Sequence, residues 1–355
     1  MKIFILILFF LRFFSLASAE DLSVVITPHD SNIRYVGRFD FKDPAGPQCA
    51  WSASSIKLQF EGKNIEAVFQ EQGQSYWQVF VDGVATIVIP LQEGRQTYPL
   101  ATDLPETSHT IELVKRTEAR VGVTQFLGFK LIGNGRALPS KPLSRRIEVI
   151  GDSISCGFGN EATSKEAPFT PETENASLTY GFLAARQLNA EYLCVAWSGK
   201  KMWPDNTIPE LYERILPNSP ESQWDFTQWI PDAVVINLAT NDFRKENPDE
   251  KEWTKAYINF VKKIRTHYPN AIIYCSSGPM ISDGPAWKPL TTLQSYLRTI
   301  ISTFQTEGDI KVQPLEFETQ KESDGIGAQW HPSLKTHQMM NEKLKTALAK
   351  DLEWK

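Results

Sequence analysis

The hydrophobic periodicity changes once along this chain of 355 residues, and the change divides the chain into two parts. Between about residues 24 and 132, short segments alternate apolar and polar residues, with turn signals such as Glu61-Gly62 and Asp82-Gly83 between them. Such alternation is typical of strands that are buried on one face. Many short strands of this kind predict an all-β sandwich domain of the jelly-roll type over residues 20–138.

A stretch at residues 139–146 is rich in Pro and Arg, and we interpret it as an exposed linker. Beyond it, apolar strand-like runs such as RIEVIGDS and AVVINLATND alternate with helical patterns. Helices are expected over about residues 251–265 and 293–304, and from Ser333 onward. Strands that alternate with helices predict a parallel sheet covered on both faces, so residues 147–355 should form a doubly wound α/β domain.

Residues 1–19 have a basic start, an apolar run and the small residues Ala17-Ser18-Ala19 at their end. This pattern predicts a secretory signal peptide that is cleaved after Ala19, and therefore a secreted or periplasmic protein. An uncleaved anchor is the alternative, but Arg12 interrupts the apolar run and the run is short for a membrane span.

Removal of residues 1–19 takes away two basic residues and no acidic one, so the net charge changes from −5 to −7. Net charge of this sign does not attract nucleic acid or anionic lipid, so we expect neither nucleic acid nor, after cleavage, a membrane as a partner. A neutral polymer would meet no electrostatic barrier. We expect a monomer.

The four cysteines are widely spaced and form no CxxC or Cys/His cluster, so neither zinc nor a disulfide scaffold is predicted. Cys194 and Cys275 fall inside apolar strand-like runs and are expected to be buried thiols. No metal and no cofactor is implied.

Polar residues that suggest chemistry follow the predicted strands of the second domain. They occur in four segments: Gly151-Asp152-Ser153, Ser198-Gly199-Lys200, Asn241-Asp242 and Trp330-His331-Pro332. Ligands of open parallel sheets bind outside the carboxyl ends of the strands. The four segments should therefore converge on one site.

Acyl transfer from an ester needs a nucleophile, a base and donors for the oxyanion. Ser153, at a strand-to-helix turn, is the candidate nucleophile, and His331 is the candidate base. The N–H groups of Ser153 and Gly199 and the side-chain amide of Asn241 are the candidate oxyanion donors.

Each of these residues also has a purely structural interpretation. Ser153 could cap a helix, Gly199 could end a strand, and Asn241 could stabilise a turn. Asp152 and Asp242 are expected to hold their loops rather than to take part in chemistry. The base has four competitors with weaker positions in the pattern: His29, His109, His267 and His337.

Two further features remain open. Trp330 is expected to be a platform for a sugar ring, although it could simply pack under its loop. Trp197 and Trp203, which flank the Gly199 segment, have a weaker claim to line the same cleft. Asn175-Ala176-Ser177 is an N-glycosylation sequon, which matters only in a eukaryotic source.

The segments GDSISCGFG, the Gly199 loop, ATND and WHPS resemble, in order, the four sequence blocks of the SGNH (GDSL-like) hydrolases. With the preceding sandwich and the Trp before the His, the chain is most similar to carbohydrate esterase family 2. The resemblance implies a flavodoxin-like sheet and a serine esterase that removes acetyl groups from xylan and related polysaccharides. It also implies that Ser153 and His331 carry the reaction and that Trp330 binds the sugar.

Two positions depart from that pattern. Ala239 replaces a common Gly, and Ala328 stands where many relatives have an Asp three residues before the catalytic His. Some members of the resembling family use a Ser–His dyad, so we expect a neutral group, most simply a main-chain carbonyl, to orient His331. Glu322 and Asp324 are close in sequence but have no suitable spacing.

Two other functions are compatible with the same residues. One keeps the Ser–His pair but acts on a lipid or a thioester. The other is a carbohydrate-binding protein with a decayed esterase site, which the missing Asp would explain.

Overall fold

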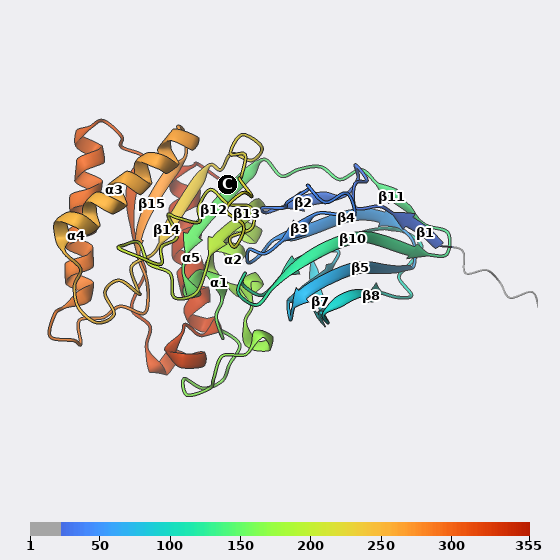
Figure 1. The fold of residues 1–355 in the computed structure, drawn as a ribbon, viewed down its shortest axis with the longest axis horizontal. Helices are drawn as coiled ribbons and strands as arrows, with labels where there is room; N and C mark the ends of the chain where they lie inside the picture. Colours follow the sequence, from blue (N-terminus) through green and yellow to red (C-terminus); the bar gives the residue numbers. More distant parts are fainter. Residues whose placement is uncertain (1–22) are drawn as a thin grey trace, which may run out of the picture.

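The computed structural model describes residues 23–355, which form a sandwich domain followed by an α/β domain along the long axis of the molecule (Figure 1). The predicted signal peptide at residues 1–19 lies outside the described residues. No helix within residues 23–355 is both long and apolar enough to cross a membrane.

The first domain consists of two antiparallel sheets that enclose a hydrophobic core. One sheet has the spatial order β1-β10-β5-β8, with β3 also paired to β10. Its strands are β1 (Ser23–Ile26), β3 (Gln48–Cys49), β5 (Asn64–Gly73), β8 (Gly94–Ala101) and β10 (Gly122–Ile132).

The other sheet has the order β11-β4-β9-β6-β7, with β2 paired to β4. Its strands are β2 (Arg34–Val36), β4 (Ser55–Glu61), β6 (Tyr76–Val81), β7 (Val84–Pro90), β9 (Ser108–Lys115) and β11 (Arg136–Leu138). Alternate residues of β4 and β5 point into the core, as the sequence pattern predicts. The predicted sandwich is confirmed.

The second domain contains a five-stranded sheet in which all neighbouring strands are parallel. The spatial order β13-β12-β14-β15-β16 is the flavodoxin-like order 2-1-3-4-5. The strands are β12 (Arg145–Gly151), β13 (Ala190–Ala196), β14 (Ala233–Asn237), β15 (Ile272–Ser277) and β16 (Val312–Glu316). The three strands β13 to β15 are buried along their whole length because helices cover both faces.

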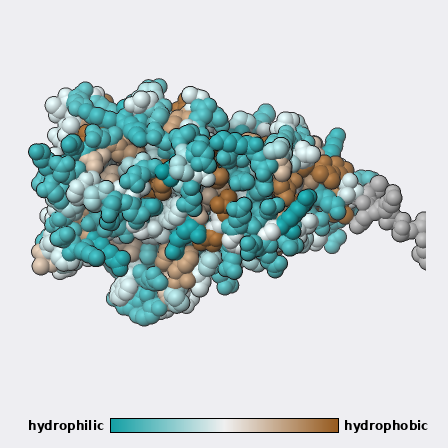
Figure 2. Space-filling model, in the orientation of Figure 1, coloured by the Kyte–Doolittle hydropathy of each residue, from teal (hydrophilic) through white to brown (hydrophobic). Residues whose placement is uncertain are grey.

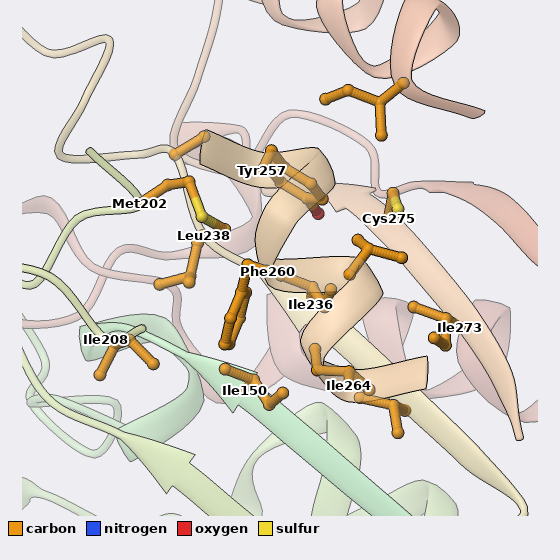
Figure 3. Packing of buried hydrophobic residues seen from close by; sticks show 14 of the residues in the cluster. Ile150, Met202, Ile208, Ile236, Leu238, Tyr257, Phe260, Ile264, Ile273 and Cys275 are labelled. Atoms are coloured by element: carbon orange, nitrogen blue, oxygen red, sulfur yellow. The ribbon is translucent and has the colours of Figure 1, made fainter. Parts of the chain in front are cut away.

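Helices α2 (Tyr180–Gln187) and α5 (Leu334–Asp351) cover one face of this sheet, and α3 (Glu250–His267) and α4 (Pro289–Thr306) cover the other. Figure 3 shows Tyr257, Phe260 and Ile264 of α3 packed against apolar side chains of the strands beneath it. The doubly wound prediction is thus confirmed. The remaining helical turns are α1 (Ser153–Cys156), η1 (Pro171–Thr173), η2 (Ala176–Leu178), η3 (Glu322–Asp324) and η4 (Ala328–Trp330).

Local sequence signals explain the ends of the helices. The side chain of Asp249 accepts a hydrogen bond from the Glu252 N–H at the start of α3, and Ser333 caps α5 in the same way. Helix α4 begins at Pro289, four residues before the predicted start, because Pro suits the first turn of a helix.

The two domains are joined by a short connection and by buried charges. Strand β11 ends at Leu138 and β12 begins at Arg145, so the first strand of the parallel sheet takes up the last two residues of the predicted linker. Arg38 of the sandwich pairs with Glu148 of β12 at 3.1 Å, and both side chains are fully buried. Such a pair fixes the docking of the domains, because removal of one partner would leave an uncompensated buried charge.

All four cysteines are buried free thiols. This confirms the prediction for Cys194 and Cys275. The face of the molecule shown in Figure 2 is mainly hydrophilic, with hydrophobic residues gathered at the end of the sandwich that is remote from the α/β domain.

Candidate active site

The four predicted segments meet at the carboxyl end of the parallel sheet, where the strand order switches at β12. Ser153 follows β12, Gly199 follows β13, Asn241 follows β14, and His331 precedes α5. Three of these four residues (Ser153, Asn241 and His331) line one open cleft of about 370 Å³. Gly199 is not among the described residues that line it, although hydrogen bonds attach its loop to the Asn241 segment.

Ser153 is the first residue of α1, and its side chain faces His331. The Oγ atom of Ser153 lies 2.8 Å from Nε2 of His331, which is hydrogen-bonding distance. The preceding Asp152 is fully buried and caps α1 by accepting a hydrogen bond from the Ile154 N–H at 3.0 Å. Burial raises the pKa of the Asp152 carboxyl to about 7. Its contacts support the loop-holding role expected for Asp152.

The other ring nitrogen of His331 meets a main-chain oxygen. Nδ1 lies 3.0 Å from the carbonyl oxygen of Ala328, which therefore accepts the Nδ1 hydrogen when Nε2 is the acceptor. Gln329 and Trp330 adopt left-handed backbone angles, with φ of 50° and 67°, and this tight turn directs the carbonyl back toward the ring. The main-chain carbonyl that we expected to orient His331 is therefore the one of Ala328.

The side chain of Ala328 packs against Gly159. Ala328 is fully buried, and a Cβ atom added to Gly159 would lie only 2.4 Å from the Ala328 Cβ. Gly159, with φ of 53°, is therefore required where the two backbones approach each other. The backbone of this turn, and not a carboxylate, supplies the partner of His331.

The imidazole of His331 is shielded from water. Its ring stacks on Phe158 with centroids 4.1 Å apart. Burial lowers the pKa of His331 to about 4, and the positive charges of Arg244 and Arg120 act in the same direction. A neutral imidazole is the form that can accept a proton from Ser153, so the environment keeps the base ready at neutral pH.

Of the three candidate oxyanion donors, the Ser153 N–H lies at the start of α1, and the other two lie on two connected loops. The Nδ2 atom of Asn241 donates to the carbonyl oxygen of Lys200 at 2.9 Å. Nδ2 also makes a longer contact, 3.5 Å, with Oδ2 of Asp152, so the amide of Asn241 is held between the Lys200 and Asp152 segments. Gly199 has φ of 79°, and a Cβ atom added there would meet no atom within 4 Å. The open space above Gly199 is compatible with close approach of a substrate.

Asp242 holds the Gly199 loop in place. Its carboxylate accepts from the main-chain N–H groups of Met202 and Trp203 at 3.0–3.1 Å and from the indole of Trp253 at 2.8 Å. This role is the one expected from the sequence.

The cleft is lined by exposed aromatic rings. Trp330 is 50% exposed, and the ammonium group of Lys165 lies 4.2 Å from the ring centroid on one of its faces. Trp330 therefore lines the cleft instead of packing under its loop. Trp287, which the sequence analysis did not single out, also lines the cleft and is 36% exposed. Its position in a Pro-rich stretch was the signal that could have identified it.

Other candidates lie away from the cleft. Trp197 and Trp203 pack, partly buried, against the core that α3 covers. His337 is buried and stacks on Tyr180, and burial lowers its pKa to about 3.

The sequon at Asn175 is inaccessible in the folded domain, because the side chain is 1% exposed and its amide donates to Glu161 at 3.1 Å.

The sequence also gave no indication that the sandwich domain reaches the site. Arg120, in the loop between β9 and β10, places its guanidinium 5.3 Å from the Phe158 ring, which stacks on His331. Glu118, in the same loop, accepts a hydrogen bond from Ser198, the neighbour of Gly199, at 2.7 Å. Contacts between residues this far apart in sequence leave no periodic signal.

Comparison with known proteins agrees with both domains. Residues 35–142 match the N-terminal domain of carbohydrate esterase 2, and residues 149–339 match the GDSL-like lipase/acylhydrolase family. A family two carbohydrate esterase from Clostridium thermocellum, solved in complex with cellohexaose, has a similar fold, with a TM-score of 0.87 and 41% identity. That similarity covers 91% of this chain and 100% of the solved chain.

Two curated relatives are similar in sequence. The cellulase/esterase CelE of Acetivibrio thermocellus is 41% identical over 92% of this chain, but this chain spans only 41% of CelE. An acetylxylan esterase/glucomannan deacetylase of Cellvibrio japonicus is 26% identical, over 93% of this chain and 91% of its own length. The resemblance seen in the four sequence blocks is confirmed. The chain belongs to the GDSL-like lipase/acylhydrolase family and, with its N-terminal sandwich, to carbohydrate esterase family 2.

Proposed function

We propose that this protein is a serine esterase that removes O-acetyl groups from polysaccharides such as xylan. The observation that carries the proposal is the 2.8 Å contact between Ser153 Oγ and His331 Nε2 in a cleft with an exposed Trp330. A nucleophile in contact with an oriented neutral base is the arrangement that acyl transfer requires. This intact pair speaks against a decayed site.

In the first half of the reaction, Ser153 Oγ attacks the acetyl carbonyl carbon while its proton moves to Nε2 of His331. The negative charge on the carbonyl oxygen is stabilised by the N–H groups of Ser153 and Gly199 and the amide of Asn241. When the tetrahedral intermediate collapses, the protonated His331 gives its proton to the departing sugar oxygen. The deacetylated polysaccharide leaves, and an acetyl ester remains on Ser153.

In the second half, water replaces the sugar. His331 takes a proton from the water as its oxygen attacks the acetyl carbon, and the same donors stabilise the second oxyanion. Collapse of this intermediate returns the proton to Ser153 and releases acetate. The carbonyl of Ala328 holds the Nδ1 hydrogen throughout, so that Nε2 alternates between acceptor and donor.

The shape and the lining of the cleft support a polysaccharide substrate. The cleft is open, and Trp330 and Trp287 present exposed ring surface beside polar groups such as Arg244. Aromatic faces bind the apolar faces of sugars, and polar groups bind the hydroxyls. The names of the relatives point to the same class of substrate.

The predicted signal peptide supports action outside the cytoplasm, secreted or in the periplasm, where polysaccharides are met. The negative net charge supports a neutral polymer as the partner, rather than nucleic acid or a membrane surface. We propose that the mature chain acts as a monomer, since one chain supplies the nucleophile, the base and the oxyanion donors that the proposed reaction needs.

The proposal is tested by measuring acetate release from a panel of acetylated polysaccharides, with Ser153→Ala as the control. Release from at least one acetylated glycan by the wild-type protein alone is expected. Nitrophenyl esters of increasing chain length separate the alternatives, since an acetyl esterase prefers the shortest acyl group and a lipase prefers longer ones. Absence of hydrolysis with every acetyl ester would contradict the proposal.

A further inference from the structure

The loop between β9 and β10, residues 116–121, belongs to the sandwich domain but contacts the α/β domain; residues 116–119 are buried, and the Arg120 side chain is 38% exposed. Arg116 pairs with Glu161, and its side chain also donates to the carbonyl oxygen of Glu172 at 3.0 Å. The carbonyl oxygen of Arg116 accepts a hydrogen bond from the Ala176 N–H at 2.9 Å. These contacts fix the 116–121 loop against the segment 161–176, which follows α1 of the α/β domain.

Glu118 connects this loop to the oxyanion donors. Its Oε2 atom accepts the Ser198 N–H at 2.7 Å, and the side chain is fully buried. A short bond from an N–H group to a carboxylate is stronger than one between neutral groups. It fixes the peptide plane before Ser198, and the next peptide carries the Gly199 N–H. Because no side-chain packing can hold Gly199 itself, the buried acceptor limits how this N–H can turn.

Arg120 connects the same loop to the base. Its Nε atom donates to Oε1 of Glu118 at 2.5 Å. Its guanidinium lies 4.3 Å from the ring centroid of Phe169 and 5.3 Å from that of Phe158, which stacks on His331. One ion pair therefore supports the oxyanion loop through its carboxylate and the imidazole through its cation.

The surroundings of Glu118 do not suggest another role for it. Glu118, Cys156 and Glu174 bring potential metal-ligand atoms within 4.8 Å of one another. However, Glu118 already accepts from Ser198 and Arg120, and Oε2 of Glu174 accepts the Glu118 N–H at 3.0 Å. Burial raises the pKa values of Glu174 and Cys156 well above their usual range, which favours the neutral forms of both groups. The charge of Arg120 is then balanced by Glu118.

We propose that Glu118 and Arg120 are positioning residues for ester hydrolysis, supplied by the sandwich domain to the Gly199 loop and to His331. The sandwich is then part of the catalytic architecture and not only a neighbouring module. This inference rests on the proposed esterase function.

The test compares Glu118→Ala with Glu118→Gln, using a soluble acetyl ester. Glu118→Ala should lower kcat by about a hundredfold with KM changed less than about twofold, because displacement of a catalytic donor acts on the transition state. Glu118→Gln keeps an oxygen acceptor for Ser198 and should recover most of the activity. The matched control is Glu112→Ala, which removes a buried carboxylate of β9 that pairs with Lys57 at 3.0 Å and with Arg186 at 2.7 Å.

Thermal unfolding and titration of active sites with a phosphonate ester separate positioning from loss of folded protein. Rates are expressed per titrated site. A Glu118→Ala enzyme with wild-type kcat per site, or a Glu112→Ala enzyme with the same loss per site, would overturn the inference. A wild-type protein without ester hydrolysis would instead remove the proposed function, and the inference with it.

Arg120→Ala provides a second test if Glu118→Ala does not fold. The positive charges of Arg244 and Arg120 act on the pKa of His331, and His337 is the titratable group that interacts with it. Removal of the Arg120 charge should raise the apparent pKa of the acid limb of kcat/KM and lower kcat about tenfold. Arg136→Ala, which breaks an exposed pair with Glu61 in the sandwich, is the control. An unchanged acid limb together with an unchanged kcat in Arg120→Ala would overturn the proposal.

Discussion

The Nδ1 atom of His331 lies 3.0 Å from the main-chain oxygen of Ala328. A carbonyl at this place fixes the tautomer of the imidazole, as a carboxylate would, but it brings no negative charge to stabilise the imidazolium. As the proposed base, His331 therefore depends on burial, on stacking with Phe158 and on the rigid turn at Gln329 and Trp330.

The first prediction concerns pH. Protonation of His331 abolishes the base, so kcat/KM should fall on the acid side with the pKa of the free enzyme. Because burial lowers that pKa to about 4, activity should stay constant from neutral pH down to about pH 5 and fall below it. A pH–rate profile measured where the fold is intact checks this. An acid limb at or above about 6.5, the ordinary value for histidine, would indicate a carboxylate partner instead.

The second prediction concerns the nucleophile. Ser153→Ala removes the hydroxyl that contacts His331 and leaves the cap of α1, which Asp152 provides, intact. The variant should lose about a thousandfold or more in kcat with unchanged thermal unfolding. Steady-state kinetics with a short acetyl ester measure the loss. If the variant kept a tenth of the wild-type activity, Ser153 would not be the nucleophile.

Much of the site could be predicted because its parts follow consecutive strands. Once the strands were predicted to be parallel, Ser153 and Asn241 had to emerge at the same edge of the sheet. The partner of His331 could also be anticipated, because Ala328 at the usual Asp position leaves main-chain groups as the simplest acceptors. The first relation follows from the pairing of parallel strands, and the second from a turn of only four residues.

The contacts of Glu118 and Arg120 could not be predicted in this way. They depend on how the sandwich docks onto the α/β domain, which is decided by buried pairs such as Arg38–Glu148 and not by a periodic pattern. Trp287 was missed for a related reason, since it lies in an irregular loop whose path depends on tertiary packing. Its indole donates to the carbonyl oxygen of Phe243 at 3.2 Å.

The third prediction concerns the oxyanion. The amide of Asn241 is oriented by its bond to the carbonyl of Lys200, so Asn241→Ala should remove a preorganised donor. The expected loss in kcat is about a hundred- to a thousandfold, with little change in KM. Asn270→Ala, an exposed position before β15, is the control. A change confined to KM would make Asn241 a substrate-binding residue.

Removal of metal ions gives a separate check. EDTA should not affect the activity, and a loss of activity that zinc reverses would contradict the metal-free mechanism.

The fourth prediction concerns the sugar platform. Trp330→Ala removes an exposed ring from the cleft without altering the groups that carry the chemistry. KM for an acetylated polysaccharide should rise about tenfold, which corresponds to about 1.4 kcal/mol and lies within the range of about 0.5–1.5 kcal/mol typical of an aromatic contact. KM for a small nitrophenyl acetate should change little. Trp354→Ala, beside Arg145 and outside the cleft, is the control. Equal effects on both substrates would argue against a platform.

The last prediction concerns the two acids nearest to His331 in the sequence. Asp324 pairs with Lys335 at 2.7 Å, and Glu322 pairs with Lys165 at 2.8 Å, so both carboxylates have partners other than the imidazole. Asp324→Asn and Glu322→Gln keep the size of each side chain and remove its charge. Each should lower kcat/KM by less than about tenfold, whereas removal of a triad acid lowers kcat by about ten-thousandfold. A loss of that larger size in either variant would show that a carboxylate orients His331 during turnover, in place of the carbonyl of Ala328.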